Sequence, residues 1–334
     1  MLALLALGTL FCACAKKDPS PTYQVTIWMT SQGPPARNTL LEQANTVDEV
    51  NLFWYEAQAD GSITKKSTEN QKLLDQIREA GIKIVPSVNN EFDRARVAAI
   101  IHDPDIRAAH VRVIVDKVLE MDYDGIDIDY EGMDPEDRDD FSLFIEELAE
   151  ALHQEERILS IAVHAKTGEH AGSKSAEAQD WERLGAAVDE FKIMTYDYHW
   201  STSEAGPIAP TSWVLQVLAY ARSVVPLDKT FVGIHFYGYD WIGSRARGYT
   251  WQQVQKLVDT HDAQVQRDES GEAWFTYKDG QHTVYFADAT GLETRLEAIL
   301  EAHPGIGGVA IWRLGSEDPE NWRVMQEALK GPGN

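Results

Sequence analysis

Three acidic residues on one predicted strand, Asp127, Asp129 and Glu131, are the residues of this chain best suited to chemistry. Side chains alternate along a strand, so the three carboxyl groups share one face, while Ile126 and Ile128 point to the other. Burial and mutual repulsion raise the pKa of at least some of them. A carboxyl that keeps its proton near neutral pH can act as a general acid, and Glu131 is the longest of the three.

Two other interpretations fit part of this pattern. An alternating acidic strand on an exposed sheet edge serves only solubility, but the flanking isoleucines favour a buried strand. The same run also resembles the start of a calcium-binding loop. The closing acidic ligand of that loop would fall at Arg138, and the segment has the composition of a strand, so the sequence favours neither interpretation.

Alternating strand-like and helix-like segments predict the architecture that must position these carboxyls. Strand-like runs cover residues 24–29, 50–55, 82–88, 125–131, 158–165, 191–197, 231–237 and 308–313. Helical spacing follows most of them, at residues 70–80, 106–121, 140–153, 212–224 and 292–303. Eight such repeats predict an α/β protein, a (β/α)8 TIM barrel whose chemistry lies at the carboxyl ends of the strands.

The predicted domain plan has one insertion. Residues 273–278 and 282–287 are strand-like and flank an Asp279-Gly280 turn, so we expect a small β-hairpin after the seventh strand, within residues 262–288. The barrel itself is expected over residues 23–332. The Gly33-Pro34-Pro35 turn after the first strand does not open a phosphate-binding helix, which argues against a dinucleotide-binding fold.

The acidic run resembles the Asp-x-x-Asp-x-Asp-x-Glu signature of glycoside hydrolase family 18, the chitinase family, beginning at Asp124. Further similarity lies in the Met-Thr-Tyr-Asp run at 194–197, in residues 237–241 and around Trp312. Within that family the chain most resembles the spore-cortex and peptidoglycan N-acetylglucosaminidases. It departs from the common pattern at Asn89-Asn90, where many chitinases have Gly-Gly, and at His164, where proline is frequent.

The resemblance implies a substrate-assisted retaining mechanism. Glu131 would protonate the leaving oxygen, and the acetamido carbonyl of the substrate would attack the anomeric carbon. Asp129 would orient the acetamido N–H, Asp127 would share a proton with Asp129, and Tyr196 would hydrogen-bond the acetamido oxygen. A buried tyrosine whose hydroxyl is satisfied within the core is the alternative for Tyr196.

Further residues are expected to bind the substrate, because they lie at or near the predicted strand ends. They are Met194, Asp197, Trp312, Trp54, Tyr55, Asn89 and Tyr237, with weaker candidates at His164, His199, Trp200 and Trp241. The indole of Trp312 could stack on a sugar ring, and a core tryptophan is the alternative. The histidines form no metal-binding motif, His235 is expected to pack in the interior, and we expect neither a metal nor another cofactor.

The N-terminus and the charge bear on location and partners. An apolar stretch over residues 2–11 followed by Ala13-Cys14 resembles a lipoprotein signal, so residues 1–14 are expected as a signal peptide with Cys14 lipidated, and residues 15–22 as a tether. Ordinary secretion with a cleaved signal is the alternative. The formal net charge of −24 disfavours nucleic acid and leaves a lipid anchor as the expected membrane contact. We expect an extracytoplasmic monomer.

Three functions remain open at this point. A glycosidase acting on peptidoglycan or chitin is favoured, because the carboxyls and Tyr196 are all present. A noncatalytic lectin of the same fold would usually lack the acid, and a metal-dependent deacetylase would need ligands that this chain lacks. The resemblance and the anchor favour peptidoglycan over chitin.

Overall fold

The protein is described from a computed structural model, which covers residues 23–66, 70–315 and 317–331. The predicted signal peptide, Cys14 and the predicted tether lie outside the described residues. Within the described residues, no helix is long and apolar enough to cross a membrane.

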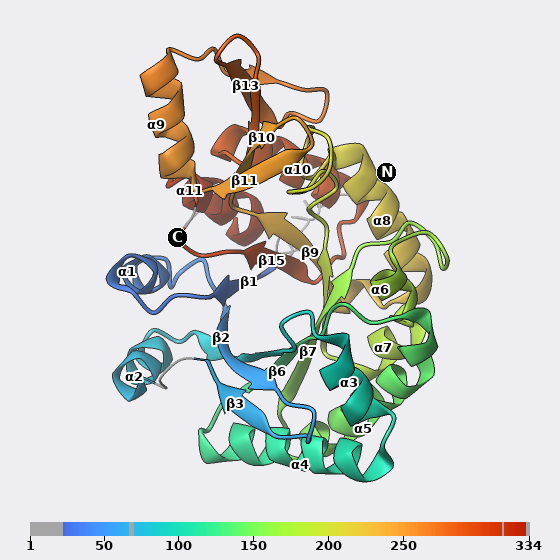
Figure 1. Cartoon of the computed structure of the whole chain (residues 1–334). Coiled ribbons are helices and arrows are strands. Elements are labelled where there is room, and N and C mark those ends of the chain that lie inside the picture. The colour runs from blue at the N-terminus through green and yellow to red at the C-terminus, as the bar shows by residue number, and fades with distance from the viewer. Residues whose placement is uncertain (1–22, 67–69, 316, 332–334) are drawn as a thin grey trace, which may run out of the picture.

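Eight parallel strands close into a barrel at the centre of the molecule (Figure 1). Strand β1 (Gln24–Met29) pairs with both β2 (Glu49–Ala57) and β15 (Gly308–Trp312), so the barrel sheet is closed. The other barrel strands are β4 (Lys83–Ile84) with β5 (Ser87–Asn89), β6 (Gly125–Asp129), β7 (Ile158–His164), β8 (Glu190–Met194) and β9 (Thr230–His235). The predicted (β/α)8 barrel is therefore confirmed.

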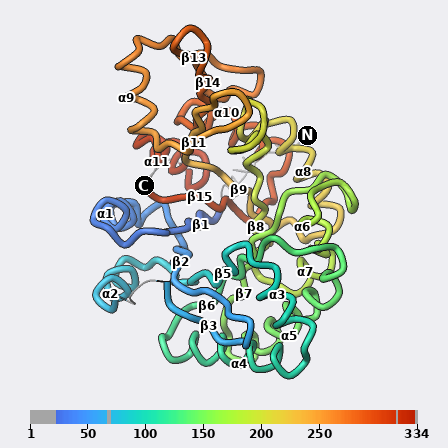
Figure 2. Tube along the Cα trace, in the orientation of Figure 1, coloured from blue at the N-terminus to red at the C-terminus, as the bar shows by residue number. Residues whose placement is uncertain are grey.

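Helices cover the outside of the barrel, and the chain returns to its start because β15 lies beside β1 (Figure 2). The α-helices of this layer are α1 (Pro34–Glu42), α2 (Gln71–Glu79), α3 (Arg94–Ile101), α4 (Pro104–Glu120), α5 (Arg138–Gln154), α6 (Lys174–Glu177), α7 (Trp181–Ala187), α8 (Thr211–Val224), α10 (Ala289–Ala302) and α11 (Asn321–Met325). Short helical turns lie at η1 (Pro135–Asp137), η2 (Leu227–Lys229) and η3 (Gln326–Lys330). Side chains cap several of these helices. For example, Asp103 accepts hydrogen bonds from the backbone N–H groups of Asp105 and Ile106 at the start of α4.

The apolar core of the barrel has two parts with different roles. The larger part fills the layer between the strands and the helices, and it includes the outward-facing Ile126 and Ile128 of β6. The smaller part lies inside the barrel, where Trp28, Ala162, Phe231 and Ala310 pack with the partly buried Phe53 and Trp312. This inner aromatic layer forms an apolar surface beneath the strand ends.

Most barrel strands end one to three residues earlier than the sequence predicts. The structure ends β6 at Asp129, β8 at Met194 and β9 at His235, whereas the apolar patterns continue to residues 131, 197 and 237. The third strand is divided into β4 and β5 around Pro86, because proline lacks the N–H that a central strand donates. The two-residue pattern continues past the last ladder hydrogen bond, so the pattern alone does not mark the ends.

The insertion after β9 is larger than the predicted hairpin. That hairpin is present as β13 (Ala273–Tyr277) and β14 (His282–Phe286), which pair in antiparallel fashion. It belongs to a five-stranded sheet with β10 (Gly238–Ile242), β11 (Arg245–Tyr249) and β12 (Gln266–Arg267), and α9 (Trp251–His261) packs against this sheet. Figure 1 shows the insertion in orange, standing beyond one side of the barrel. β10 follows β9 after two residues, so in the sequence the two strands form one continuous apolar run and the start of β10 is hidden.

Short antiparallel strand β3 (Ile63–Lys65) extends the edge of β2 and was not expected from the sequence. It follows the turn after β2 and brings Lys66 next to the ring of Phe53, with its ammonium nitrogen 5.5 Å from the ring centroid. The end of β3 thus brings a cation toward the inner aromatic layer of the barrel.

Candidate active site

The acidic side chains of β6 lie inside the barrel, as the alternation predicts. Asp127 is fully buried and accepts hydrogen bonds from Trp28 Nε1 at 2.9 Å and from the hydroxyls of Ser87 and Ser160, both at 2.7 Å. These donors come from three different strands. Asp127 is therefore fixed in the barrel interior beneath the other two carboxyls.

Asp129 is the next inward residue, one layer nearer the mouth. Its side chain is buried, and its Oδ1 atom has no hydrogen-bond partner among the described residues. Burial raises the pKa of Asp129 well above its ordinary value, and the nearby carboxyls of Glu131 and Asp127 raise it further. Asp129 thus presents a polar atom that is available to a ligand.

Glu131 lies two residues beyond the end of β6, and its backbone is held on both sides by one side chain. The Glu131 N–H donates to Asn90 Oδ1 at 2.8 Å, and Asn90 Nδ2 donates to the Glu131 carbonyl at 2.7 Å. Burial, and then the carboxylate of Asp197, raise the pKa of Glu131 to about 7. The carboxyl that comes closest to the mouth therefore keeps its proton in weakly acidic solution.

These carboxyls open into a cavity of about 770 Å³ at the carboxyl ends of the strands. Its walls are mainly aromatic. The lining residues are Trp28, Phe92, Asp129, Glu131, Gly132, Ala162, His164, Ala165, Ser173, Ser175, Met194, Tyr196, Asp197, Tyr198, Trp200, Ser201, Trp213, Tyr239 and Trp312. Acidic groups beside flat apolar walls suit a neutral, ring-shaped ligand such as a sugar.

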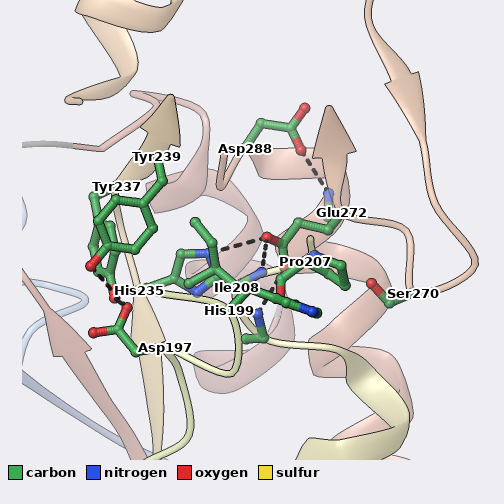
Figure 3. Close-up of polar contacts among 12 residues, drawn as sticks. Asp197, His199, Pro207, Ile208, His235, Tyr237, Tyr239, Ser270, Glu272 and Asp288 are labelled. Atoms are coloured by element: carbon green, nitrogen blue, oxygen red, sulfur yellow. Dashed lines mark hydrogen bonds and ion pairs between the residues drawn. The ribbon is translucent and has the colours of Figure 1, made fainter. Parts of the chain in front are cut away.

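One wall of the cavity is the segment that joins β8 to α8, and the insertion holds it in place. Asp197 has a left-handed backbone, with φ of 58°, and its Oδ1 accepts hydrogen bonds from Tyr237 at 2.5 Å and from Tyr239 at 3.1 Å (Figure 3). Farther along the segment, Ser201 O accepts from the N–H of Ala246 in β11 at 2.7 Å. The wall is therefore tied to β10 and β11.

A second tie comes from Glu272, just before β13. This carboxylate is 1% exposed and accepts from the N–H groups of Ile208 at 2.7 Å and Ala209 at 3.1 Å, at the far end of the same segment (Figure 3). Arg295 of α10 donates to it at 2.9 Å, and His235 Nε2 lies 3.8 Å away. The insertion thus fixes both ends of a cavity wall that has no secondary structure of its own.

The structure brings most of the predicted site residues together. Asp129, Glu131, Tyr196, Asp197, Met194 and Trp312 line the cavity, as do the weaker candidates His164 and Trp200. Trp312 packs edge to face on Trp28 and Phe53, with ring centroids 6.0 Å and 5.6 Å away. Asp127 lies beneath them and does not line the cavity.

Four predicted substrate-binding residues do not line the cavity. Trp54 and Tyr55 are buried in the outer core. Trp54 alternates with the inward-facing Phe53, and the register shift between Phe53 and Tyr55 in the pairing of β2 with β5 turns Tyr55 outward as well. The side chain of Asn89 is occupied by backbone groups. It donates to Tyr55 O of the neighbouring strand β2 at 2.8 Å and accepts from the Glu91 N–H. Tyr237 lies behind the site, where its hydroxyl donates to Asp197 and its ring packs edge to face on that of Tyr196.

Two weaker candidates have structural contacts instead. Trp241 is buried and donates from its indole N–H to Trp200 O at 3.3 Å. His199 donates from Nδ1 to Pro207 O at 2.8 Å, and its ring fills the space where a side chain at residue 206 would lie, which explains Gly206. His235 is fully buried, as expected.

Several lining residues carry no signal in the sequence, and Phe92 is the clearest case. Its side chain is 71% exposed at the cavity mouth, and the backbone of both Glu91 and Phe92 is left-handed. A Cβ atom on Gly132 would lie 2.8 Å from Phe92 O, so the glycine after Glu131 makes room for this loop. Non-glycine residues in this conformation carry no sequence signal. Trp28, Tyr198, Trp213 and Tyr239 were missed as well, as was Asn90 outside the lining.

Metal ligation has no candidate in the described part of the chain. No group of three or more histidine, cysteine, aspartate or glutamate side chains there is arranged to hold an ion. The chemistry available to the described site is that of carboxyl groups, one imidazole and aromatic walls.

Comparison with known proteins adds the following findings. The model of the family described as Glycosyl hydrolases family 18 matches residues 22–318. The chain is 26% identical over 287 residues to a cortical fragment-lytic enzyme of Bacillus subtilis and 28% identical over 289 residues to one of Bacillus anthracis, covering 82% of this chain in each case. It spans 66% of the length of those two relatives.

Solved structures agree with this match. A chitinase from Chromobacterium violaceum superposes with a TM-score of 0.85 at 26% identity, covering 92% of this chain and 99% of that one. The spore cortex-lytic enzyme SleL of Bacillus megaterium superposes with a TM-score of 0.84 at 23% identity, covering 93% and 75%, and supports the fold alone.

Proposed function

The chain belongs to the family 18 glycosyl hydrolases, and on that premise we propose that it cleaves β-1,4 linkages in polymers that contain N-acetylglucosamine. Glu131 is the general acid and base of this reaction. The observation that carries the proposal is the position of Glu131, with its pKa raised to about 7, in an aromatic-walled cavity at the carboxyl ends of the barrel strands. Below that pH the carboxyl has a proton to give to a leaving oxygen.

The mechanism we propose uses the acetamido group of the substrate as nucleophile, as family 18 enzymes do. Glu131 protonates the glycosidic oxygen while the acetamido carbonyl attacks the anomeric carbon. Water then attacks the anomeric carbon from the face that the leaving group vacated, which opens the cyclic intermediate and returns a proton to Glu131. The configuration is therefore retained. A second carboxylate nucleophile is not needed.

The other carboxyls have supporting roles in this mechanism. Asp129 receives the acetamido N–H on its unpartnered Oδ1 and shares a proton with Asp127 below it. Tyr196 lines the cavity, and its hydroxyl is assigned to the acetamido oxygen. Trp312 offers an indole face to the sugar ring, and Met194 and Asp197 complete the pocket.

We further propose that the natural polymer is peptidoglycan rather than chitin. Two relatives are named for cortical fragment lysis, and lipidation at Cys14 would place the barrel beside the cell wall, outside the cytoplasm. The net charge of −24 opposes binding of the peptide carboxylates in peptidoglycan. Screening over about 8 Å at physiological salt confines that repulsion to close contacts.

Product analysis tests this proposal. The purified protein is incubated with peptidoglycan fragments and with chitin oligomers, and the products are identified by mass spectrometry, with Glu131→Gln as the matched blank. We expect fragments that end in reducing N-acetylglucosamine from peptidoglycan and weaker cleavage of chitin. Efficient chitin cleavage with intact muropeptides would overturn the cell-wall assignment. Binding of either glycan without cleavage would instead favour the lectin.

A further inference from the structure

His164 ends β7 directly beside the carboxyl of Glu131. β7 is the parallel neighbour of β6, so the ends of the two strands lie together at the mouth. His164 Nε2 lies 3.3 Å from Glu131 Oε2. It makes no hydrogen bond to Glu131 or to any other residue in the described part of the chain, so it is free to form one. The His164 N–H donates to Gln179 Oε1 at 2.8 Å, which fixes the end of the strand.

The charge state of this pair follows from burial. The side chains are 24% exposed for His164 and 17% for Glu131. Burial lowers the pKa of His164 to about 4 and raises that of Glu131 to about 7, so between these values the carboxyl holds the proton and the imidazole is neutral. The alternative, an ion pair of imidazolium and carboxylate, would place two charges in the same desolvated site.

We propose that His164 is a further residue of the reaction, a neutral donor whose Nε2–H hydrogen-bonds Glu131 Oε2 and leaves Oε1 to face the substrate. This inference rests on the proposed role of Glu131 as general acid. Contacts of this kind are often long in the absence of substrate and shorten when it binds. We assign Nε2 as the donor, because an Nε2 that accepted a hydrogen bond would hold the carboxyl proton of Glu131 on Oε2, away from the substrate.

The contact acts on the proton-transfer step. As the proton passes from Glu131 Oε1 to the leaving oxygen, the C–O bond breaks and its electron pair stays with that oxygen. The carboxyl becomes a carboxylate, and its negative charge is stabilised by the Nε2–H of His164. His164 neither gains nor loses a proton, and water later restores the proton of Glu131.

The carboxyl groups around the pair cannot stabilise the carboxylate of Glu131. The titratable groups facing the pair are Asp127 and Asp129 on the strand of Glu131, Tyr196 and Asp197 beyond β8, and Lys66 beyond β3, which acts on Asp129. The carboxylates oppose a charge on Glu131. Among the described residues, the imidazole of His164 is the one basic group within ion-pair distance of Glu131.

Two substitutions separate this role from simple packing. His164→Leu keeps the site filled but removes the donor, whereas His164→Gln keeps an N–H near the position of Nε2. We expect kcat to fall by roughly 10- to 100-fold in the leucine variant, the effect of one hydrogen bond to a charged group. The basic limb of its pH–rate profile should move up by about one unit, because the carboxylate is no longer stabilised. The glutamine variant should recover much of both.

The outcomes test the role of His164 and the role of Glu131 separately. Exposed His170→Leu is the matched control, and thermal unfolding verifies that each variant folds. The role of His164 would be overturned if His164→Leu kept the wild-type kcat and an unshifted basic limb of the pH–rate profile. A downward shift of that limb, or a glutamine variant no more active than the leucine variant, would also overturn it. Glu131→Gln is measured in parallel. If it stays active, the assignment of Glu131 fails, whatever His164 does.

Discussion

Two groups of buried carboxyls lie inside the same barrel, and only one of them contains a cation. At the amino ends of the strands, Lys192 Nζ lies 2.8 Å from Glu49 and 3.1 Å from Glu190. At the carboxyl ends, Asp129 and Glu131 have no lysine or arginine within ion-pair distance among the described residues. The first group keeps a buried positive charge, and the second has a protonated carboxyl that a substrate can reach.

The two groups differ in their cation, although each contains a carboxyl whose pKa is raised. Burial alone would lower the pKa of Lys192, but Glu49, Glu190 and Asp127 raise it above its ordinary value, so the lysine stays charged. Burial and Glu190 raise the pKa of Glu49 to about 8 despite this cation. In a (β/α)8 barrel the amino ends of the strands serve stability and the carboxyl ends serve function, and here the placement of one lysine separates the two.

Removing that lysine is expected to have the largest effect. Lys192→Met leaves Glu49 and Glu190 buried without a cation, and breaking a buried ion pair from one side costs about 3–5 kcal/mol. Urea unfolding at pH 8 measures this loss, with the exposed Lys256→Met as control. A loss of stability no greater than that of the control would mean that the amino-end group is not held together by charge.

At the carboxyl end, Asp129→Asn is expected to reduce turnover with little loss of stability. The substitution replaces the carboxyl that orients the acetamido N–H by an amide that cannot share a proton with Asp127. We expect kcat to fall by about 100-fold or more, the low end for loss of a group in acid–base catalysis. Substrates without the 2-acetamido group should be hydrolysed very poorly by both proteins. Equal hydrolysis with and without that group would rule out the substrate as nucleophile, and the exposed Asp116→Asn controls for charge.

Glu272 is an intermediate case. It is a buried carboxyl paired with Arg295, as in the first group, but it lies behind a wall of the active-site cavity. Glu272→Ala leaves the N–H groups of Ile208 and Ala209 without their acceptor, and each lost partner in a buried site costs about 1–3 kcal/mol. Because the same segment carries Trp200 of the cavity wall, we expect KM for a glycan to rise more than kcat falls. An unchanged KM in a destabilised variant would limit Glu272 to a structural role.

The smallest expected effect is a gain in stability. Glu131 titrates near 4.5 when unfolded and near 7 when folded, so the folded state binds more protons between these values and loses stability as pH rises through them. Glu131→Gln does not titrate, and relative to wild type it should be about 1–3 kcal/mol more stable at pH 8 than at pH 4. Urea unfolding at both pH values checks this. If the free energies of unfolding of variant and wild type differed by the same amount at both pH values, the prediction would be contradicted. The exposed Glu182→Gln variant is the control, for which we expect that result.

The sequence predicted much of the barrel and of its acidic strand, because both depend on simple alternation. Asp127, Asp129 and Glu131 follow the two-residue period of a strand, and that period puts them inside any closed barrel. The structure places all three inside or at its mouth. The strand ends, by contrast, depend on the last ladder hydrogen bond, which leaves no mark in the sequence.

The residues that the sequence placed wrongly depend on local backbone geometry. Trp54 and Tyr55 were expected at the mouth, but Trp54 alternates with the inward-facing Phe53, and an irregular register in β2 turns Tyr55 outward as well. Phe92 is presented by two left-handed residues that are not glycine. The insertion was underestimated because β10 continues the apolar run of β9.

The pKa of Glu131 itself is the most direct test of the central claim, that this carboxyl holds its proton near neutral pH. Carbon-13 NMR of the Glu131 side-chain carboxyl, assigned by its absence in Glu131→Gln, follows the titration without any substrate. We predict a midpoint near 7, together with a fall in activity as pH rises through the same value. A midpoint near the ordinary 4.5, with activity unchanged between pH 5 and 8, would contradict the account.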